Sequence, residues 1–234
     1  MIDVRRLGLV PYRDALELQR ALVDDRKAGR IPDTLLLLEH PHVVTLGVRK
    51  GGAANIIATP AQLAELGVEV FETGRGGDVT YHGAGQLVAY PILDLRPDRQ
   101  DVHCYVRDLE EVMIRVCGDF GIEASRVSGM SGAWVGADKI GAVGVRISRW
   151  VTSHGIAFNV NTDLDYFKLI VPCGITDRGV TSLARVTGTS HTLADIEDRF
   201  ERHFKDVFGN RPAAEGFTSV DERGTADCPA SSPR

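Results

Sequence analysis

Apolar positions recur at helical spacing in several stretches, and residues that start or stop helices bound each one. Ala15, Leu18 and Leu22 repeat every three to four positions ahead of Gly29. A longer apolar stripe follows the capping Asp101, and Cys117 falls on it, which predicts core packing for this thiol. The pattern predicts helices over residues 12–28, 60–66, 102–120 and 193–208.

Shorter apolar runs, bounded by glycine, proline and polar residues, indicate strands. We expect strands over residues 34–41, 43–47, 68–73, 86–95, 122–127, 133–136, 139–149 and 151–161. Strands cluster in the middle of the chain with helices before, between and after, without the regular alternation of a doubly wound fold. This order predicts an α+β fold with a mixed, largely antiparallel sheet flanked by helices.

The first 210 residues show no linker and no internal repeat, so we expect one domain over residues 1–210. Residues 211–234 are small, polar and aperiodic, which predicts a disordered tail that carries Cys228.

Composition narrows the function classes. The chain is 43% hydrophobic and 25% charged, with a net charge of −5 and no strongly basic block, so we expect no nucleic-acid or membrane partner. The N-terminal residues hold no apolar run long enough for a signal peptide or a membrane span, and we expect a cytoplasmic protein. The four cysteines form no CxxC pair, which predicts no zinc site.

Residues 74–86, GRGGDVTYHGAGQ, lie between two predicted strands and hold five glycines. Glycines let a backbone approach a ligand closely, so the segment is typical of a binding loop, and a flexible hairpin is the alternative. The pattern GxxxxGK[ST] is absent, and no GxGxxG follows a strand and opens a helix, which disfavours a phosphate-binding loop.

Lys139 opens an apolar, glycine-rich strand and is the only lysine between residues 51 and 167. A lysine desolvated there would have a lowered pKa. Half neutrality near pH 7 requires a drop of about three pKa units, at a cost of about 4 kcal/mol. A lysine at a strand end that extends to water is the alternative.

Cys173 stands between Pro172 and Gly174, so we expect it on a loop. A loop cysteine beside a basic group can become a reactive thiolate, whereas a partly buried structural cysteine is inert. Sequence spacing does not decide whether Lys139 is that basic neighbour. No GxSxG serine elbow and no HExxH pattern compete with these residues.

Three segments in order resemble the octanoyl-(acyl-carrier-protein):protein octanoyltransferase family. RGGDVTYHGAGQ (75–86) resembles its RGG-x-x-T-[YF]-H-G-P-G-Q motif, and KIGAVGVR (139–146), followed by RW and HGIAFN, resembles its K-I-x-A-x-G-[VI]-R segment. IVPCGI (170–175) resembles I-x-P-C-G-[IM], and the likeness covers about residues 5–208. Ala84 stands where the family usually has proline and Gly141 where alanine is common, and neither change removes a reactive group.

The resemblance implies the catalytic-domain fold of biotin/lipoate protein ligases and transfer of an octanoyl group to a lysine of a lipoyl domain. The donor would be octanoyl-acyl carrier protein, and the acceptors the lipoyl domains of 2-oxoacid dehydrogenase complexes and the glycine cleavage H protein. Cys173 matches the family's nucleophile and Lys139 its basic partner. No cofactor or metal is implied, and we expect a monomer. The residues that match its substrate-binding segments are Arg75, Gly76, Gly77, Asp78, Val79, Thr80, Tyr81, His82, Ala142, Val143, Gly144, Gly155, Ile156 and Ala157.

A thioester carbonyl is a good target for a thiolate, and exchange between thioesters needs no ATP, which agrees with the missing phosphate motifs. An octanoyl chain would need an apolar tunnel, and we expect Val79, Val143 and Ile156 in its walls. Three alternatives stay open: an ATP-dependent lipoate ligase of the same fold, an amidotransferase that moves octanoyl between lipoyl domains, and a non-catalytic protein that binds acyl carrier protein.

Overall fold

A computed structural model of the chain describes residues 1–171 and 178–209. The predicted tail at residues 211–234 and the predicted nucleophile Cys173 lie outside the described residues.

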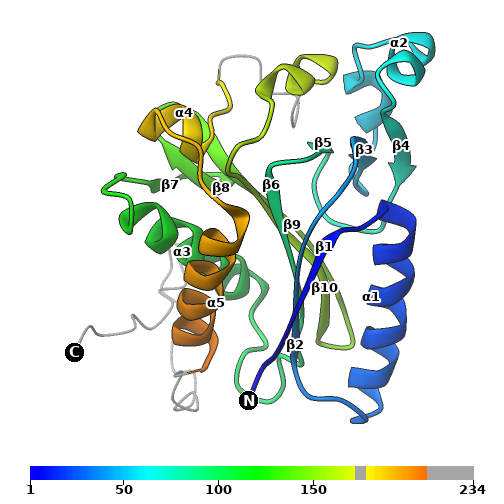
Figure 1. Cartoon of the computed structure of the whole chain (residues 1–234). Coiled ribbons are helices and arrows are strands. Elements are labelled where there is room, and N and C mark those ends of the chain that lie inside the picture. Colours follow the sequence, from blue (N-terminus) through cyan, green and yellow to red (C-terminus); the bar gives the residue numbers. More distant parts are fainter. Residues whose placement is uncertain (172–177, 210–234) are drawn as a thin grey trace, which may run out of the picture.

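Two sheets organise the described part of the chain (Figure 1). The larger sheet has seven strands in the order β1-β2-β6-β10-β9-β8-β7, and only β1 and β2 run parallel. Its strands are β1 (Asp3–Leu9), β2 (Thr34–Glu39), β6 (Gln86–Ile92), β7 (Ser125–Val127), β8 (Met130–Val135), β9 (Asp138–Ser148) and β10 (Val151–Asn159). The expected mixed, largely antiparallel sheet is therefore confirmed.

A smaller sheet adjoins the larger one, with strand order β4-β3-β5. It contains β3 (Val43–Leu46), β4 (Glu69–Glu72) and β5 (Val79–His82), and two short elements, η1 (Gly52–Asn55) and α2 (Pro60–Glu65), connect β3 to β4. Helix α2 begins as expected at Pro60, directly after the capping residue Thr59, whose hydroxyl and Gln62 form a reciprocal capping box. β5 corrects the expectation of a continuous loop over residues 74–86, because Val79–His82 pair with β3.

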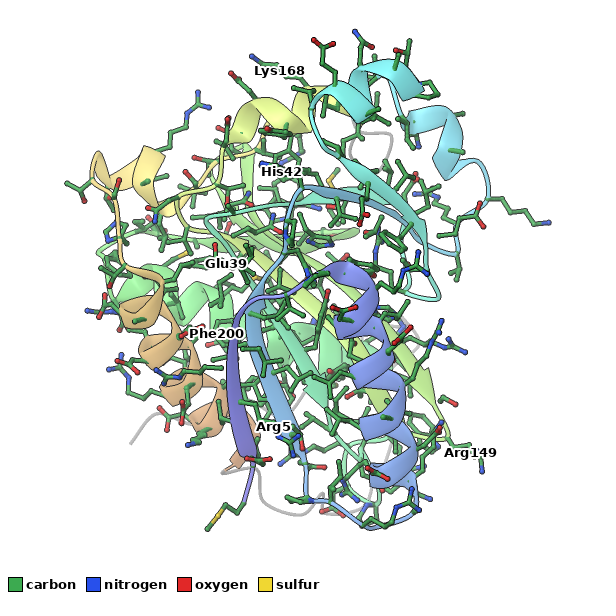
Figure 2. The ribbon with its side chains drawn as sticks, turned by 45° about the vertical axis from the view of Figure 1, so that its right-hand side comes forward. Arg5, Glu39, His42, Arg149, Lys168 and Phe200 are labelled. Atoms are coloured by element: carbon green, nitrogen blue, oxygen red, sulfur yellow. The ribbon has the colours of Figure 1, made fainter. Side chains whose placement is uncertain are left out.

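Helices cover both faces of the larger sheet (Figure 1). α1 (Tyr12–Lys27) packs on one face, where Ala15 and Leu22 meet Leu36 and Leu38. α3 (Val102–Gly118) and α5 (Leu193–Gly209) cover the other face, and Phe200 of α5 is fully buried in that core (Figure 2). Two further short elements are η2 (Leu164–Leu169) and α4 (Leu183–Thr187).

The stripe on α3 packs as its spacing predicts, with one exception. Asp101 accepts a hydrogen bond from the Cys104 amide at 2.9 Å and so caps the helix. Cys117 is fully buried in the core and desolvation raises its pKa to about 12, which confirms a packing role. Val102, the first apolar residue after the capping Asp101, is 44% exposed because it lies in the first turn, beyond the edge of the core.

Candidate active site

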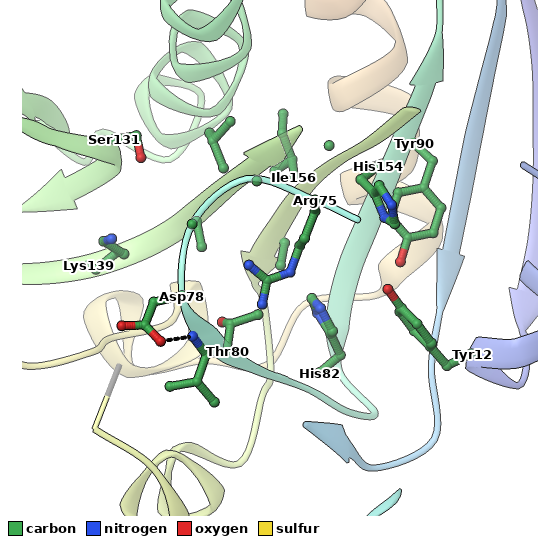
Figure 3. A pocket seen from close by; sticks show the side chains of 17 residues that line it. Tyr12, Arg75, Asp78, Thr80, His82, Tyr90, Ser131, Lys139, His154 and Ile156 are labelled. Atoms are coloured by element: carbon green, nitrogen blue, oxygen red, sulfur yellow. Dashed lines mark hydrogen bonds between the residues drawn. The ribbon is translucent and has the colours of Figure 1, made fainter. Parts of the chain in front are cut away.

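One pocket lies where the small sheet meets β6, β9 and β10. Figure 3 shows Lys139 and Ser131 on one side of it and Tyr12, Tyr90 and His154 on the other. Its lining residues come from α1, the segment before and within β5, and strands β6, β8, β9 and β10: Tyr12, Arg75, Gly77, Asp78, Val79, Thr80, His82, Tyr90, Ser131, Lys139, Ala142, Val143, Gly144, His154, Gly155, Ile156 and Ala157.

The structure brings most of the sequence-predicted site residues together here. All predicted substrate-binding residues line the pocket except Gly76 and Tyr81, and Lys139 lines it too. Tyr81 belongs instead to the core of the small sheet, where its ring stacks on Tyr166 with centroids 5.2 Å apart. Gly76 contacts β9 through its amide, which donates to the Val145 carbonyl at 2.8 Å.

Lys139 is the second residue of β9, and backbone hydrogen bonds hold it in place. Its amide donates to the Gly179 carbonyl at 3.0 Å, and its carbonyl accepts from the Thr181 amide at 2.9 Å. The half-buried side chain places Nζ 4.7 Å from the centroid of the Trp134 ring. A basic group therefore lies at the more exposed end of the pocket.

Cys173 itself lies outside the described residues, but the residues on both sides of it contact the pocket region. Before the gap, the Val171 amide donates to the Asn55 carbonyl at 2.7 Å, and Asn55 Nδ2 donates to Asp78 at 2.8 Å. After it, Gly179 pairs with Lys139 as described above. Both flanks of the cysteine segment are thus tied to residues next to the pocket lining.

Arg75 is buried inside the pocket wall, at 7% exposure. Its Nη2 donates to the Thr45 carbonyl at 2.6 Å and to the Thr45 hydroxyl at 2.9 Å, and its Nη1 donates to the Gly76 carbonyl at 3.0 Å. A Cβ on Gly144 would lie 3.1 Å from Arg75 Cδ, so the glycine leaves room for the guanidinium stem. Arg75 therefore fixes the loop that carries the predicted binding residues.

His82 is neutral within a directed chain of hydrogen bonds. Its Nδ1 lies 2.8 Å from Gln86 Oε1, which accepts, so Nδ1 carries the proton. The Thr45 hydroxyl, 3.4 Å away, can then donate to Nε2. Burial, reinforced by His40, lowers the pKa of His82 to about 3. A structural, hydrogen-bonded histidine matches these contacts better than a base.

The closed end of the pocket is aromatic and contains residues that sequence reasoning missed. Tyr12, Tyr90 and His154 are 2%, 3% and 4% exposed. The Tyr90 hydroxyl lies 2.8 Å from Nε2 of His40, whose Nδ1 donates to the Val10 carbonyl, so Tyr90 donates to His40. Burial lowers the pKa of both His40 and His154 to about 4. These groups are uncharged at pH 7.

His154 adopts an unusual backbone conformation, with φ at 55° inside β10, and its amide donates to Gln19 of α1 at 2.7 Å. In the sequence, His154 is marked only by the HGIAFN segment, which belongs to the family resemblance. No motif marks Tyr12 or Tyr90, because the patterns of the helix and the strand that carry them predict ordinary core packing.

Among residues 1–171 and 178–209, no helix is both long and apolar enough to cross a membrane.

Comparison with known proteins assigns the chain to a family. A model of the lipoyl protein ligase A/B catalytic domain matches residues 11–205. An octanoyltransferase of Solibacter usitatus is 54% identical over 88% of this chain and 92% of its own, and an octanoyltransferase of Koribacter versatilis is 54% identical over 89% and 84%. A bi-partite lipoate protein ligase from Thermoplasma acidophilum shares the fold at a TM-score of 0.66 and 16% identity, over 89% of this chain and 85% of that one. The chain therefore belongs to the lipoyl protein ligase A/B catalytic-domain family and, within it, to the octanoyltransferases, which are acyltransferases.

Proposed function

We propose that the protein moves an octanoyl group from the thioester of an acyl carrier protein to one lysine of a lipoyl domain, through a thioester on Cys173. The observation that carries the proposal is the pocket itself. A lysine lies at its exposed end, Val79, Val143 and Ile156 contribute apolar walls, and neutral aromatic side chains close the far end. Such a slot suits an unbranched apolar chain whose carbonyl stays beside the lysine.

The mechanism begins with proton transfer from the Cys173 thiol to a neutral Lys139. The Cys173 sulfur attacks the thioester carbonyl, the carbonyl–sulfur bond to the carrier breaks, and the carrier thiolate takes the proton back from Lys139. The octanoyl group now forms a thioester on Cys173. The acceptor lysine amine attacks this carbonyl, the Cys173 sulfur leaves, and Lys139 relays the amine proton to it. Each step exchanges one acyl bond for another, so the balance needs no ATP.

The experiment is intact mass measurement after mixing the protein with octanoyl-acyl carrier protein in the absence of ATP. We expect one added octanoyl group on the wild-type chain and none on Cys173→Ser. Cys117→Ala is the matched control, because Cys117 is a fully buried thiol whose pKa burial raises to about 12. This variant should still gain the octanoyl group.

Lys139→Ala tests the base separately. It should fold and bind the acyl chain, since its backbone bonds remain, yet gain the adduct at least about a hundredfold more slowly. A rate equal to that of the wild type would remove Lys139 from the mechanism.

The rivals predict other outcomes. An adduct that appears only with ATP and free octanoate would indicate a ligase. Faster acylation of Cys173 by an octanoylated lipoyl domain than by the carrier protein would indicate an amidotransferase. A chain that binds the carrier protein but never becomes acylated would be a non-catalytic binder.

A further inference from the structure

Two loops run side by side along the outer wall of the pocket. The Val48 amide donates to the Arg75 carbonyl at 3.0 Å, and the Arg49 amide donates to the Gly77 carbonyl at 3.1 Å. Residues 46–52 read LGVRKGG and residues 74–77 read GRGG, so neither loop contains an acid. Arg75 and Gly77 of the second loop line the pocket.

β9 brings one more cation to these loops. A Cβ on Gly74 would lie 2.6 Å from Arg146 Nη1, so the Arg146 guanidinium lies directly against the second loop. We call Val48, Arg49, Lys50 and Arg146 the basic rim. All four are exposed, and Val48 is 65% exposed. The rim therefore combines three cations with one apolar side chain.

The charges of the rim are not neutralised within the described part of the chain. No ion pair forms there on Arg49, Lys50 or Arg146, whereas many other arginines pair, such as Arg126 with Glu111 at 2.7 Å. Asp78, the acid that follows the second loop directly in the sequence, is 5% exposed and accepts from Asn55 and Val79 instead. This local excess contrasts with the net charge of −5.

We propose that the basic rim is the docking surface for the acidic face of the carrier protein that delivers the acyl group. The inference rests on the proposed function, because it takes its donor from there. Charge complementarity selects this occupant: exposed cations without ion-pair partners in the described residues attract an acidic protein and orient it, and the exposed Val48 adds an apolar contact. Docking here brings the partner against the wall of the pocket that its acyl chain must enter.

The test compares two octanoyl donors with the wild-type chain and with Arg49→Glu/Lys50→Glu. Octanoyl-acyl carrier protein presents the acidic face, and octanoyl-N-acetylcysteamine offers the same thioester without a protein. In the double variant, we expect KM for the carrier substrate to rise at least about tenfold with kcat unchanged, and kcat/KM for the small thioester to change less than about twofold. Arg146→Glu should raise KM for the carrier substrate about threefold.

Salt gives a second readout. Raising the ionic strength from about 50 to about 300 mM should raise the wild-type KM for the carrier substrate several-fold, because screening weakens exposed charge pairs, and should barely affect the double variant. Arg149→Glu is the matched control: Arg149 is an exposed cation at the turn of the β9–β10 hairpin, outside the basic rim (Figure 2). Its KM for both donors should stay at the wild-type value.

Several results would overturn the docking surface. In the double variant, these results are an unchanged KM for the carrier substrate, an equal loss of kcat/KM with both donors, or a rise in KM for the lipoyl domain alone. The last would assign the rim to the acceptor. A wild-type chain that accepts no octanoyl group from the carrier protein at all would instead overturn the proposed function, so the two failures can be told apart.

Discussion

Gly155 stands where β10 packs tightly against its neighbour β6. A Cβ added there would lie 2.2 Å from the Ala89 carbonyl oxygen and 2.7 Å from Pro91 Cδ, and neither group can rotate away. We predict that Gly155→Ala lowers the free energy of unfolding by about 2–4 kcal/mol, because the strands must separate to admit one methyl group. Urea denaturation followed by circular dichroism measures the change.

Gly118→Ala is the control for that substitution. Gly118 is the last residue of α3, and a Cβ there would meet nothing within 4 Å. Its unfolding free energy should stay within about 1 kcal/mol of the wild-type value. Equal effects at the two positions would show that the close approach of β10 to β6 does not matter.

Single residues of the site were predictable only where a local motif marks them. Lys139, Arg75 and His82 lie in segments whose glycine content and order are distinctive, and the structure gathers all three at one pocket. Tyr12 and Tyr90 were missed because their own neighbourhoods look like ordinary core. They face the pocket only because α1 packs across β6, a long-range event that local sequence does not record.

At the scale of elements, the contact between α3 and β9 explains why residue 141 is glycine. A Cβ at this position would lie 2.3 Å from Sδ of Met113, which is fully buried. We predict that Gly141→Ala destabilises the wild-type chain by about 1–3 kcal/mol, because the methionine already fills the space. The same change should cost at least about 1 kcal/mol less in a Met113→Val background, where the methyl group has room.

The measurement is a double-mutant cycle of unfolding free energies from urea denaturation. Additive effects of the two substitutions would contradict the packing argument. The cycle also isolates the contact from the cavity that Met113→Val leaves, since that cost appears in both the single and the double variant.

Elements with strong periodicity were predictable, and elements that depend on a partner were not. The stripes of α1, α3 and α5 and the apolar runs of β2 and β6 formed where their patterns indicated. β1 (DVRRLGL) carries two arginines and only scattered apolar residues, yet forms an edge strand because β2 offers a parallel partner. β5 was hidden among glycines and is a strand because β3 pairs with it.

At the scale of the whole molecule, folding buries three histidines and keeps them uncharged. His40, His82 and His154 come from three separate parts of the chain, and burial lowers their pKa values to about 4, 3 and 4. In the unfolded chain each has its ordinary pKa near 6.5. Below that pH the unfolded chain binds protons that the folded chain does not, so stability present above pH 6.5 is lost as the pH falls toward about 4.

We predict that the free energy of unfolding falls steeply between pH 7.5 and pH 5.0. Each buried histidine contributes a loss of about 2 kcal/mol by pH 5, or several kcal/mol for the three together. Urea denaturation at the two pH values measures the difference. Carboxyls such as Asp94, whose pKa an arginine holds below its ordinary value, lose their stabilising effect only at more acidic pH and do not add to this fall. Burial raises the pKa of Glu110 and Glu197, so these two groups oppose the fall rather than cause it.

His154→Asn assigns part of that slope to a single group. Asparagine tolerates the positive φ of 55° at this position and does not titrate, so the variant should fold. Its loss of stability between pH 7.5 and pH 5.0 should be smaller than that of the wild type by about 2 kcal/mol. If the variant loses as much stability as the wild type between pH 7.5 and pH 5.0, His154 takes up its proton in the folded chain within that range. The closed end of the pocket would then carry a charge beside the acyl tail, and its proposed role as the apolar end of the slot would fail with it.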